Sequence, residues 1–151
     1  ISSIVSLMNL TDSILQVMYS GDIMAKKSKE LTVNRFVRTA RGIIPIEEIT
    51  TSKKLSVFFR DGSGTTGSEN IANAIREAGS NLGLKIKSEK YLLGSGAFTP
   101  FSKNHFPACS LGTSKERTSK CFFANADKLS DISKKSVADV GSLIIETLNL
   151  F

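Results

Sequence analysis

A strand, a glycine-rich loop, a helix and a second strand follow one another between residues 54 and 91, and this succession constrains the fold more than any other feature. The segment KLSVFFRD is rich in the β-branched and aromatic residues that favour strands. SENIANAIREAGSNLG carries one apolar stripe at helical spacing, and LKIKSEKY again has a strand pattern. Two strands joined through a helix usually lie parallel with a right-handed crossover, so the sequence predicts an α/β fold.

The expected helix of this unit has recognisable ends. Thr66 and Glu69 have the spacing of a capping box, and Gly83 is a typical stop. The residues predicted on its buried side are Ile71, Ile75, Ala78 and Leu82.

Shorter patterns predict the other elements. GIIPIEEI should be extended, because Pro45 excludes a helix interior, and PACSLG should be a short buried strand. A short helix should follow Pro100, and a last helix should run from Lys134 to Leu150. The residues predicted on the buried face of that last helix are Val137, Val140, Ile144 and Leu148.

The first third of the chain is less clear and more basic. Residues 1–10 fit a strand or a helix, and residues 11–24 fit a helix. Residues 31–39 suggest a strand, with a short helix as the alternative. Residues 26–60 carry nine Lys or Arg against three acidic residues, whereas the rest of the chain has 11 of each sign. This region is either a solvated face or a surface for an acidic partner. Nucleic acid is not expected, because few aromatic residues interleave with the bases.

At 151 residues the chain has the length of a single domain. It begins with Ile1 rather than Met, so we expect it to be part of a longer parent protein. No apolar stretch reaches the roughly 18 residues of a membrane span. Cys109 and Cys121 either pair or stay as buried thiols, and the apolar surroundings of Cys109 favour a core position.

The loop DGSGTTGSE lies between a strand and a helix, where phosphate-binding loops occur. Gly62 and Gly67 have the glycine spacing of a P-loop, but Ser68 and Glu69 replace its lysine and hydroxyl residue. A flavodoxin-like nucleotide or phosphate module would use Gly62, Gly64, Thr66 and Gly67. The alternative is a plain turn into a capped helix.

Four later segments carry a resemblance. The segment IPIEEITTSKKLSV is similar to a strand with the motif N-L-D-M-I-G, and SGAFTPF is similar to S-D-H-x-P-F. The segment SKNHFPACSLG is similar to A-K-A-G-I-P-A-V-S-L-G, and FFANADKLSDIS is similar to Y-H-T-P-E-D-T-L-D-K-I-D. Together, over residues 40–151, they resemble the zinc aminopeptidase family of clan MH. The resemblance implies a mixed, largely parallel sheet flanked by helices, the aminopeptidase-like or phosphorylase/hydrolase-like fold, in a reduced version.

The resemblance also implies where a metal site would lie and how it has changed. Glu47 stands where the family has a zinc-binding Asp, and Phe123 stands where it has a histidine ligand. Phe98 replaces the histidine of S-D-H-x-P-F, and His105 replaces a glycine. Because a phenyl ring has no lone pair for zinc, we expect no bound metal and no other cofactor.

We therefore predict a catalytically inactive, zinc-aminopeptidase-like domain that binds or scaffolds a protein or peptide. One alternative is a divergent metal-dependent aminopeptidase, which would need zinc and would use Glu47, Asp127 or His105. The flavodoxin-like module is a further alternative.

Overall fold

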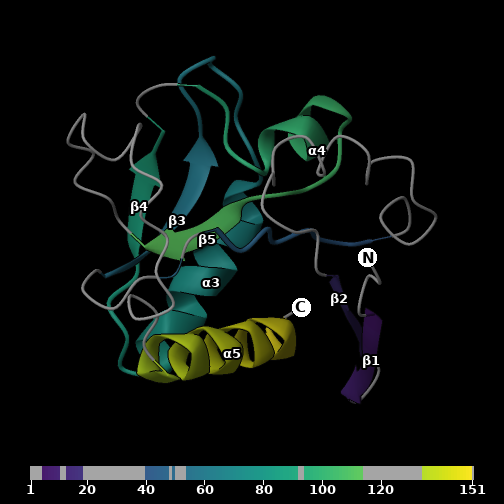
Figure 1. Cartoon of the computed structure of the whole chain (residues 1–151), viewed down its shortest axis with the longest axis vertical. Coiled ribbons are helices and arrows are strands. Elements are labelled where there is room, and N and C mark those ends of the chain that lie inside the picture. Colours follow the sequence, from purple (N-terminus) through teal and green to yellow (C-terminus); the bar gives the residue numbers. More distant parts are fainter. Residues whose placement is uncertain are drawn as a thin grey trace.

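The computed structural model describes most of the chain from residue 40 onward, together with two strands near its start (Figure 1). The described residues are 5–10, 13–18, 40–47, 49, 54–91, 94–113 and 134–150, and only the backbone is described for the first two ranges. Among these residues no helix is long and apolar enough to cross a bilayer.

The predicted parallel unit is confirmed. Strand β3 (Leu55–Arg60) is followed by helix α3 (Glu69–Asn81) and by strand β4 (Lys87–Lys90), and β4 pairs parallel to β3. Gly83 follows the helix with a φ of 70°, the left-handed conformation that favours glycine.

The start of α3 differs from the predicted capping box. Ser68 is the N-cap, and its side-chain oxygen accepts a hydrogen bond from the Ile71 backbone N–H at 3.3 Å. Thr66 instead forms a β-bridge with Arg60. Of the predicted buried side, Leu82 is the exception, because it lies at the C-cap and is exposed.

Strand β5 (Ser110–Thr113) makes the sheet mixed. It runs antiparallel to β3, which gives the strand order β4-β3-β5. The extended segment 43–47 lies along the other edge of β5, where Ile43 and Ile46 form parallel bridges. The predicted mixed sheet with flanking helices is therefore confirmed, in a reduced form.

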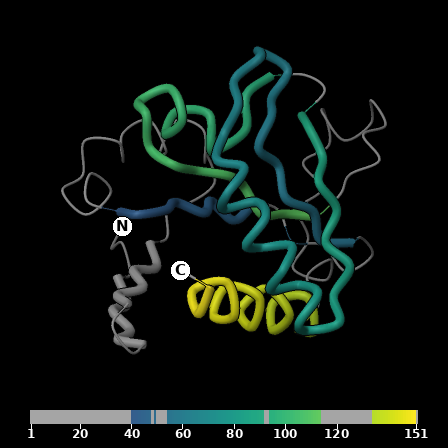
Figure 2. The backbone as a smooth tube through the Cα atoms, turned by 180° about the vertical axis from the view of Figure 1, so that it is seen from behind, coloured from purple at the N-terminus to yellow at the C-terminus, as the bar shows by residue number. Residues whose placement is uncertain are grey.

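Helices α3 and α5 (Lys134–Asn149) cover one face of this sheet, and Figure 2 shows them from behind. The core on this face comprises Leu55, Val57, Ile71, Ala72, Ile75, Ala78, Cys109, Leu111, Val140 and Leu143. Cys109 is a free, fully buried thiol, and burial raises its pKa to about 12, so it stays protonated at neutral pH. Cys121 lies outside the described residues.

The buried stripe of α5 is rotated relative to the prediction. Val140 is buried as expected, but Leu143 and Thr147 complete the buried set, and Val137 is 51% exposed. The other two predicted residues are half-buried. Thr147 can be buried because its hydroxyl donates to the Leu143 carbonyl oxygen at 2.6 Å.

An aromatic cluster covers the opposite face of the sheet. Its buried members are Phe58, Tyr91, Phe98, Phe101 and Ala108. The short helix α4 (Thr99–Lys103), predicted after Pro100, contributes Phe101. The rings of Phe58 and Tyr91 lie 4.8 Å apart between centroids, which joins β3 to the end of β4.

The start of the chain forms a hairpin of β1 (Val5–Leu10) and β2 (Ser13–Met18). The helix predicted over residues 11–24 is therefore wrong for β2, because antiparallel pairing with β1 overrides the local helical spacing. Residues 26–39 of the basic region, which include the strand predicted over residues 31–39, lie outside the described residues, as do residues 48 and 50–53.

Candidate functional site

Polar groups from separate elements converge on the turn Gly96–Thr99, called here the anchored turn. The Ala97 N–H donates to Oε1 of Glu47 at 2.8 Å. The Phe98 N–H donates to the hydroxyl of Ser110, on β5, at 3.2 Å. The anchored turn is thus fixed over the sheet face that carries the aromatic cluster, and a carboxylate lies directly beneath it.

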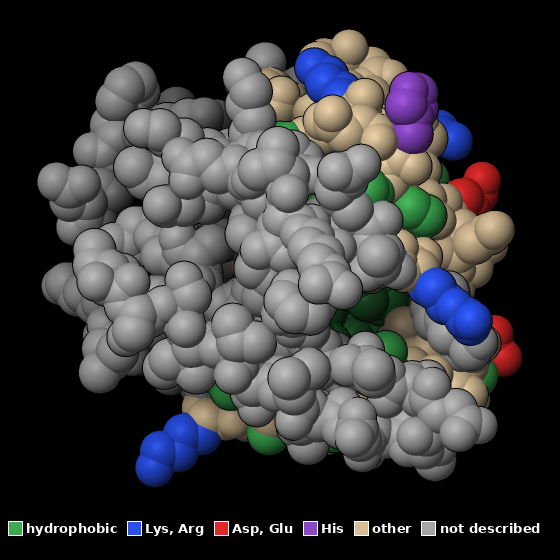
Figure 3. Space-filling model, turned by 90° about the vertical axis from the view of Figure 1, so that its right-hand side faces the viewer, with side chains coloured by type: hydrophobic (Ala, Val, Ile, Leu, Met, Phe, Trp, Pro, Cys, Tyr) green, Lys and Arg blue, Asp and Glu red, His purple; other side chains and the backbone are tan. Residues whose placement is uncertain are grey.

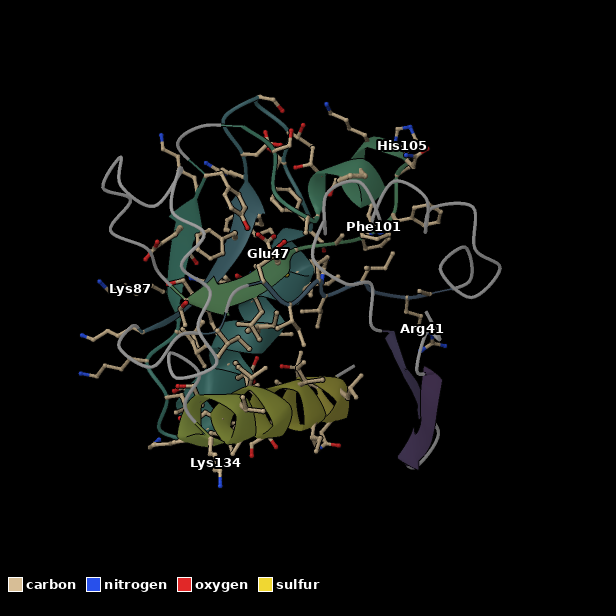
Figure 4. The ribbon with its side chains drawn as sticks, in the orientation of Figure 1. Arg41, Glu47, Lys87, Phe101, His105 and Lys134 are labelled. Atoms are coloured by element: carbon tan, nitrogen blue, oxygen red, sulfur yellow. The ribbon has the colours of Figure 1, made fainter. Side chains whose placement is uncertain are left out.

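Glu47 is positioned by its backbone as well as by its side chain. Its N–H donates to the Leu111 carbonyl oxygen at 2.8 Å. Gly112 lies alongside, and a Cβ there would come within 2.7 Å of the Glu47 carbonyl oxygen, so glycine permits this approach. The half-buried carboxylate lies near the centre of Figure 4. Within the described part of the chain, its second oxygen accepts no hydrogen bond.

The same sheet face carries a second half-buried carboxylate, that of Glu89 on β4. Its Oε1 accepts a hydrogen bond from the hydroxyl of Ser56 on β3 at 3.0 Å. Ser56 is fully buried, and this bond satisfies its hydroxyl. No local pattern in the sequence signals this contact, because the two residues are 33 positions apart.

Asp61 organises the glycine-rich loop that follows β3. Its Oδ1 accepts from the N–H groups of Ser63 and Thr65, each at 2.9 Å, and from the Ser63 hydroxyl at 2.7 Å. Its Oδ2 accepts from the Thr99 hydroxyl at 2.6 Å, which ties the loop to the anchored turn. This residue was also missed, although an Asp whose side chain binds the N–H two residues later is a known turn signal.

The electrostatic state of Asp61 follows from these contacts. Burial raises its pKa, but the hydrogen bonds from Thr99, Ser63 and Thr65 outweigh burial and hold the pKa below its ordinary value. Asp61 is therefore ionised at neutral pH, so it is not a general acid there.

The four loop residues predicted for a phosphate site are used within the fold. The N–H groups of Gly62, Gly64 and Gly67 donate to the carbonyl oxygens of Gly94, Asp61 and Phe59. Thr66 is exposed and bridges to Arg60. A phosphate cradle needs free backbone N–H groups, and these three are engaged.

Close packing requires glycine at position 67, and Gly64 in the same loop provides a matched comparison. A Cβ at Gly67 would collide with the Ala108 carbonyl oxygen, whereas a Cβ at Gly64 would meet open space. We expect Gly67→Ala to lower the free energy of unfolding by about 2–3 kcal/mol through overpacking. Gly64→Ala should cost only about 1 kcal/mol, from its φ of 84°. Urea denaturation measures both, and equal losses would contradict the packing explanation.

His105 lies at the end of α4 and away from Glu47 in Figure 4. It follows α4 with a φ of 63° and is exposed, as Figures 3 and 4 show. Its N–H donates to Ser102 and the next N–H donates to Phe101, which is the pattern of a helix C-terminus that favours glycine. This conformation gives a physical reason for the glycine at this position in the resembled motif.

The described residues do not fit a zinc site. They contain no group of three or more His, Cys, Asp or Glu side chains that could hold a metal. One oxygen of Glu47 already binds a backbone N–H, and both oxygens of Asp61 are engaged. Phe123 and Asp127 lie outside the described residues, so their predicted roles stay predictions.

Comparison with family models and with curated proteins finds no match. Solved structures do match the fold. The 5′-methylthioadenosine/S-adenosylhomocysteine nucleosidase of Helicobacter pylori aligns with a TM-score of 0.66 and 11% identity, over 99% of this chain and 85% of its own. The futalosine hydrolase of the same species aligns with a TM-score of 0.63 and 10% identity, over the same shares of the two chains.

A zinc aminopeptidase from Bacillus subtilis also matches, with a TM-score of 0.61 and 16% identity, over 82% of this chain. This chain covers only 32% of that enzyme. The aminopeptidase resemblance thus holds at the level of the fold, which is shared with nucleosidases. At these identities the likeness establishes the fold alone.

The predicted inactive aminopeptidase-like scaffold is contradicted by these comparisons. Nucleosidases align over nearly the whole chain with TM-scores up to 0.66, above that of the aminopeptidase. The flavodoxin-like alternative is also unsupported, since the loop N–H groups that it needs are engaged. Enzymes named as nucleosidases and as a futalosine hydrolase cover 99% of this chain.

Proposed function

We propose that this chain is a nucleoside hydrolase that cleaves the bond between a sugar and its base with water. The fold it shares with nucleosidases over nearly its whole length supports this class. The observation that carries the proposal is Glu47, a half-buried carboxylate held by the Ala97 N–H with its second oxygen unengaged among the described residues.

Glu47 has the properties that such a reaction requires. Cleavage of a glycosidic bond builds positive charge on the sugar, and a nearby carboxylate stabilises that charge. In the proposed step Glu47 takes a proton from water as the water oxygen bonds to the anomeric carbon. The carbon–nitrogen bond breaks, its electron pair stays on the base, and the proton passes to the departing base. The Ala97 N–H fixes one oxygen so that the other can face the substrate.

The test is release of free base, measured by liquid chromatography, from 5′-methylthioadenosine, S-adenosylhomocysteine, futalosine and inosine. We expect release from at least one of them, and Glu47→Gln should lower kcat/KM by about 100-fold. The matched control is Glu77→Gln, because Glu77 is exposed on α3 and should leave the rate unchanged. No release from any of the four, or full activity of Glu47→Gln, would overturn the proposal.

A further inference from the structure

Strand β4 is the outer strand of the sheet among the described residues. The N–H of Tyr91, directly after β4, donates inward to the Arg60 carbonyl oxygen at 2.9 Å. Because backbone groups alternate in direction along a strand, the N–H and C=O groups of Ser88 and Lys90 point away from β3. Both residues are exposed, so within the described ranges β4 presents an open row of hydrogen-bonding groups.

The same edge is basic. Lys85, Lys87 and Lys90 are exposed along it, and Lys54 and Arg60 are exposed at the two ends of β3. Figure 4 shows Lys87 extending outward from β4. The acidic residue of β4, Glu89, is half-buried and accepts a hydrogen bond from Ser56, and its one negative charge leaves the three lysines in excess.

We propose that the outer edge of β4 binds an acidic, extended protein segment as an added strand. The outward N–H and C=O groups would supply the main-chain hydrogen bonds of strand addition, and the lysines would pair with acidic side chains. Lysines on an edge strand commonly prevent pairing between like edges. The same repulsion disfavours a second copy of this basic edge and selects a segment of opposite charge.

The experiment measures the anisotropy of a labelled peptide of alternating glutamate and valine, titrated with the full chain. Ser88→Pro removes one outward N–H and leaves every charge in place, since proline is tolerated on the solvent side of an edge strand. The double change Lys87→Gln and Lys90→Gln keeps the backbone and removes two charges. The control is Lys103→Gln on α4, which is exposed and belongs to another element.

We expect both edge variants to weaken binding about tenfold and the control to bind like the wild type. In spectra of the 15N-labelled protein, the peptide should shift the amide signals of Ser88 and Lys90, which tests the site without any substitution. Failure of the peptide to bind would overturn the proposal. It would equally fail if Ser88→Pro folded and bound normally, or if the shifted amides lay elsewhere.

Discussion

Replacing Phe98 by alanine should lower the free energy of unfolding by about 3–5 kcal/mol. The ring is fully buried on the sheet face opposite α3, and its centroid lies 6.2 Å from that of Tyr91 in a stacked arrangement. It also packs against Gly67, which has no side chain at this contact. The cavity left by the ring would lie among the other buried residues of the aromatic cluster, so little collapse is expected.

The effect should be large compared with the total stability. A domain of this size is typically stable by about 5–15 kcal/mol, so the variant should unfold at a much lower urea concentration. Phe106→Ala is the matched control, because Phe106 packs at the edge of the same cluster and is only partly buried. The free energy of unfolding should fall about half as much in Phe106→Ala as in Phe98→Ala. If both variants lost the same stability, the cluster would not be centred on Phe98.

Phe98 also shows what a resemblance can and cannot predict. The resembled motif places a histidine at the position of Phe98, and the sequence alone assigns no role to the phenyl ring that replaces it. The structure gives the phenyl ring a packing role, since it is fully buried and stacks on Tyr91. Its sequence neighbours Ala97 and Thr99 are the residues bonded to Glu47 and Asp61. The local conformation of the motif is therefore held by backbone and hydroxyl contacts, in which the ring at this position takes no part.

The strand–helix–strand unit could be predicted because each of its patterns is local. The apolar residues of α3 at spacings of three and four fix its buried face, and Gly83 fixes its end. The N-cap residue of α3 could not be predicted from a local pattern, because Thr66 and Ser68 both carry a hydroxyl. A tertiary contact selects Ser68 as the N-cap, since the Ser68 N–H donates to the Ala108 carbonyl oxygen.

Which face of α5 is buried, and how most of the site is arranged, depend on contacts between residues that are distant in the sequence. Val137, Val140 and Leu143 are all apolar, and only packing against α3 selects the last two for burial. Glu47 was identified through the resemblance, but its contact with Ala97 joins residues 50 positions apart. Such contacts arise from the topology of the sheet, which residue spacing alone does not specify.

Replacing Asp61 by alanine is the second change for which we expect a large loss, of about 3 kcal/mol or more. It would leave the buried Thr99 hydroxyl without its acceptor, which costs about 1–3 kcal/mol. It would also remove three hydrogen bonds to Ser63 and Thr65, each of which contributes about 1 kcal/mol. Asp61→Asn keeps one acceptor oxygen and should lose less. Asp139→Asn is the surface control, since the exposed Lys135–Asp139 pair should contribute under about 0.5 kcal/mol.

The pH dependence of the free energy of unfolding distinguishes the contribution of the Asp61 charge from that of its hydrogen-bonding geometry. Because the folded pKa lies below the ordinary value of 3.8, the ionised carboxylate stabilises the fold at every pH above that value. This contribution should be lost as the pH falls below 3.8 and through the folded pKa. The stability difference between wild type and Asp61→Asn, measured by urea denaturation from neutral to acidic pH, should therefore narrow only at the acidic end. A difference that stayed constant down to the lowest pH would mean that geometry alone, and no charge on Asp61, holds the loop against the anchored turn.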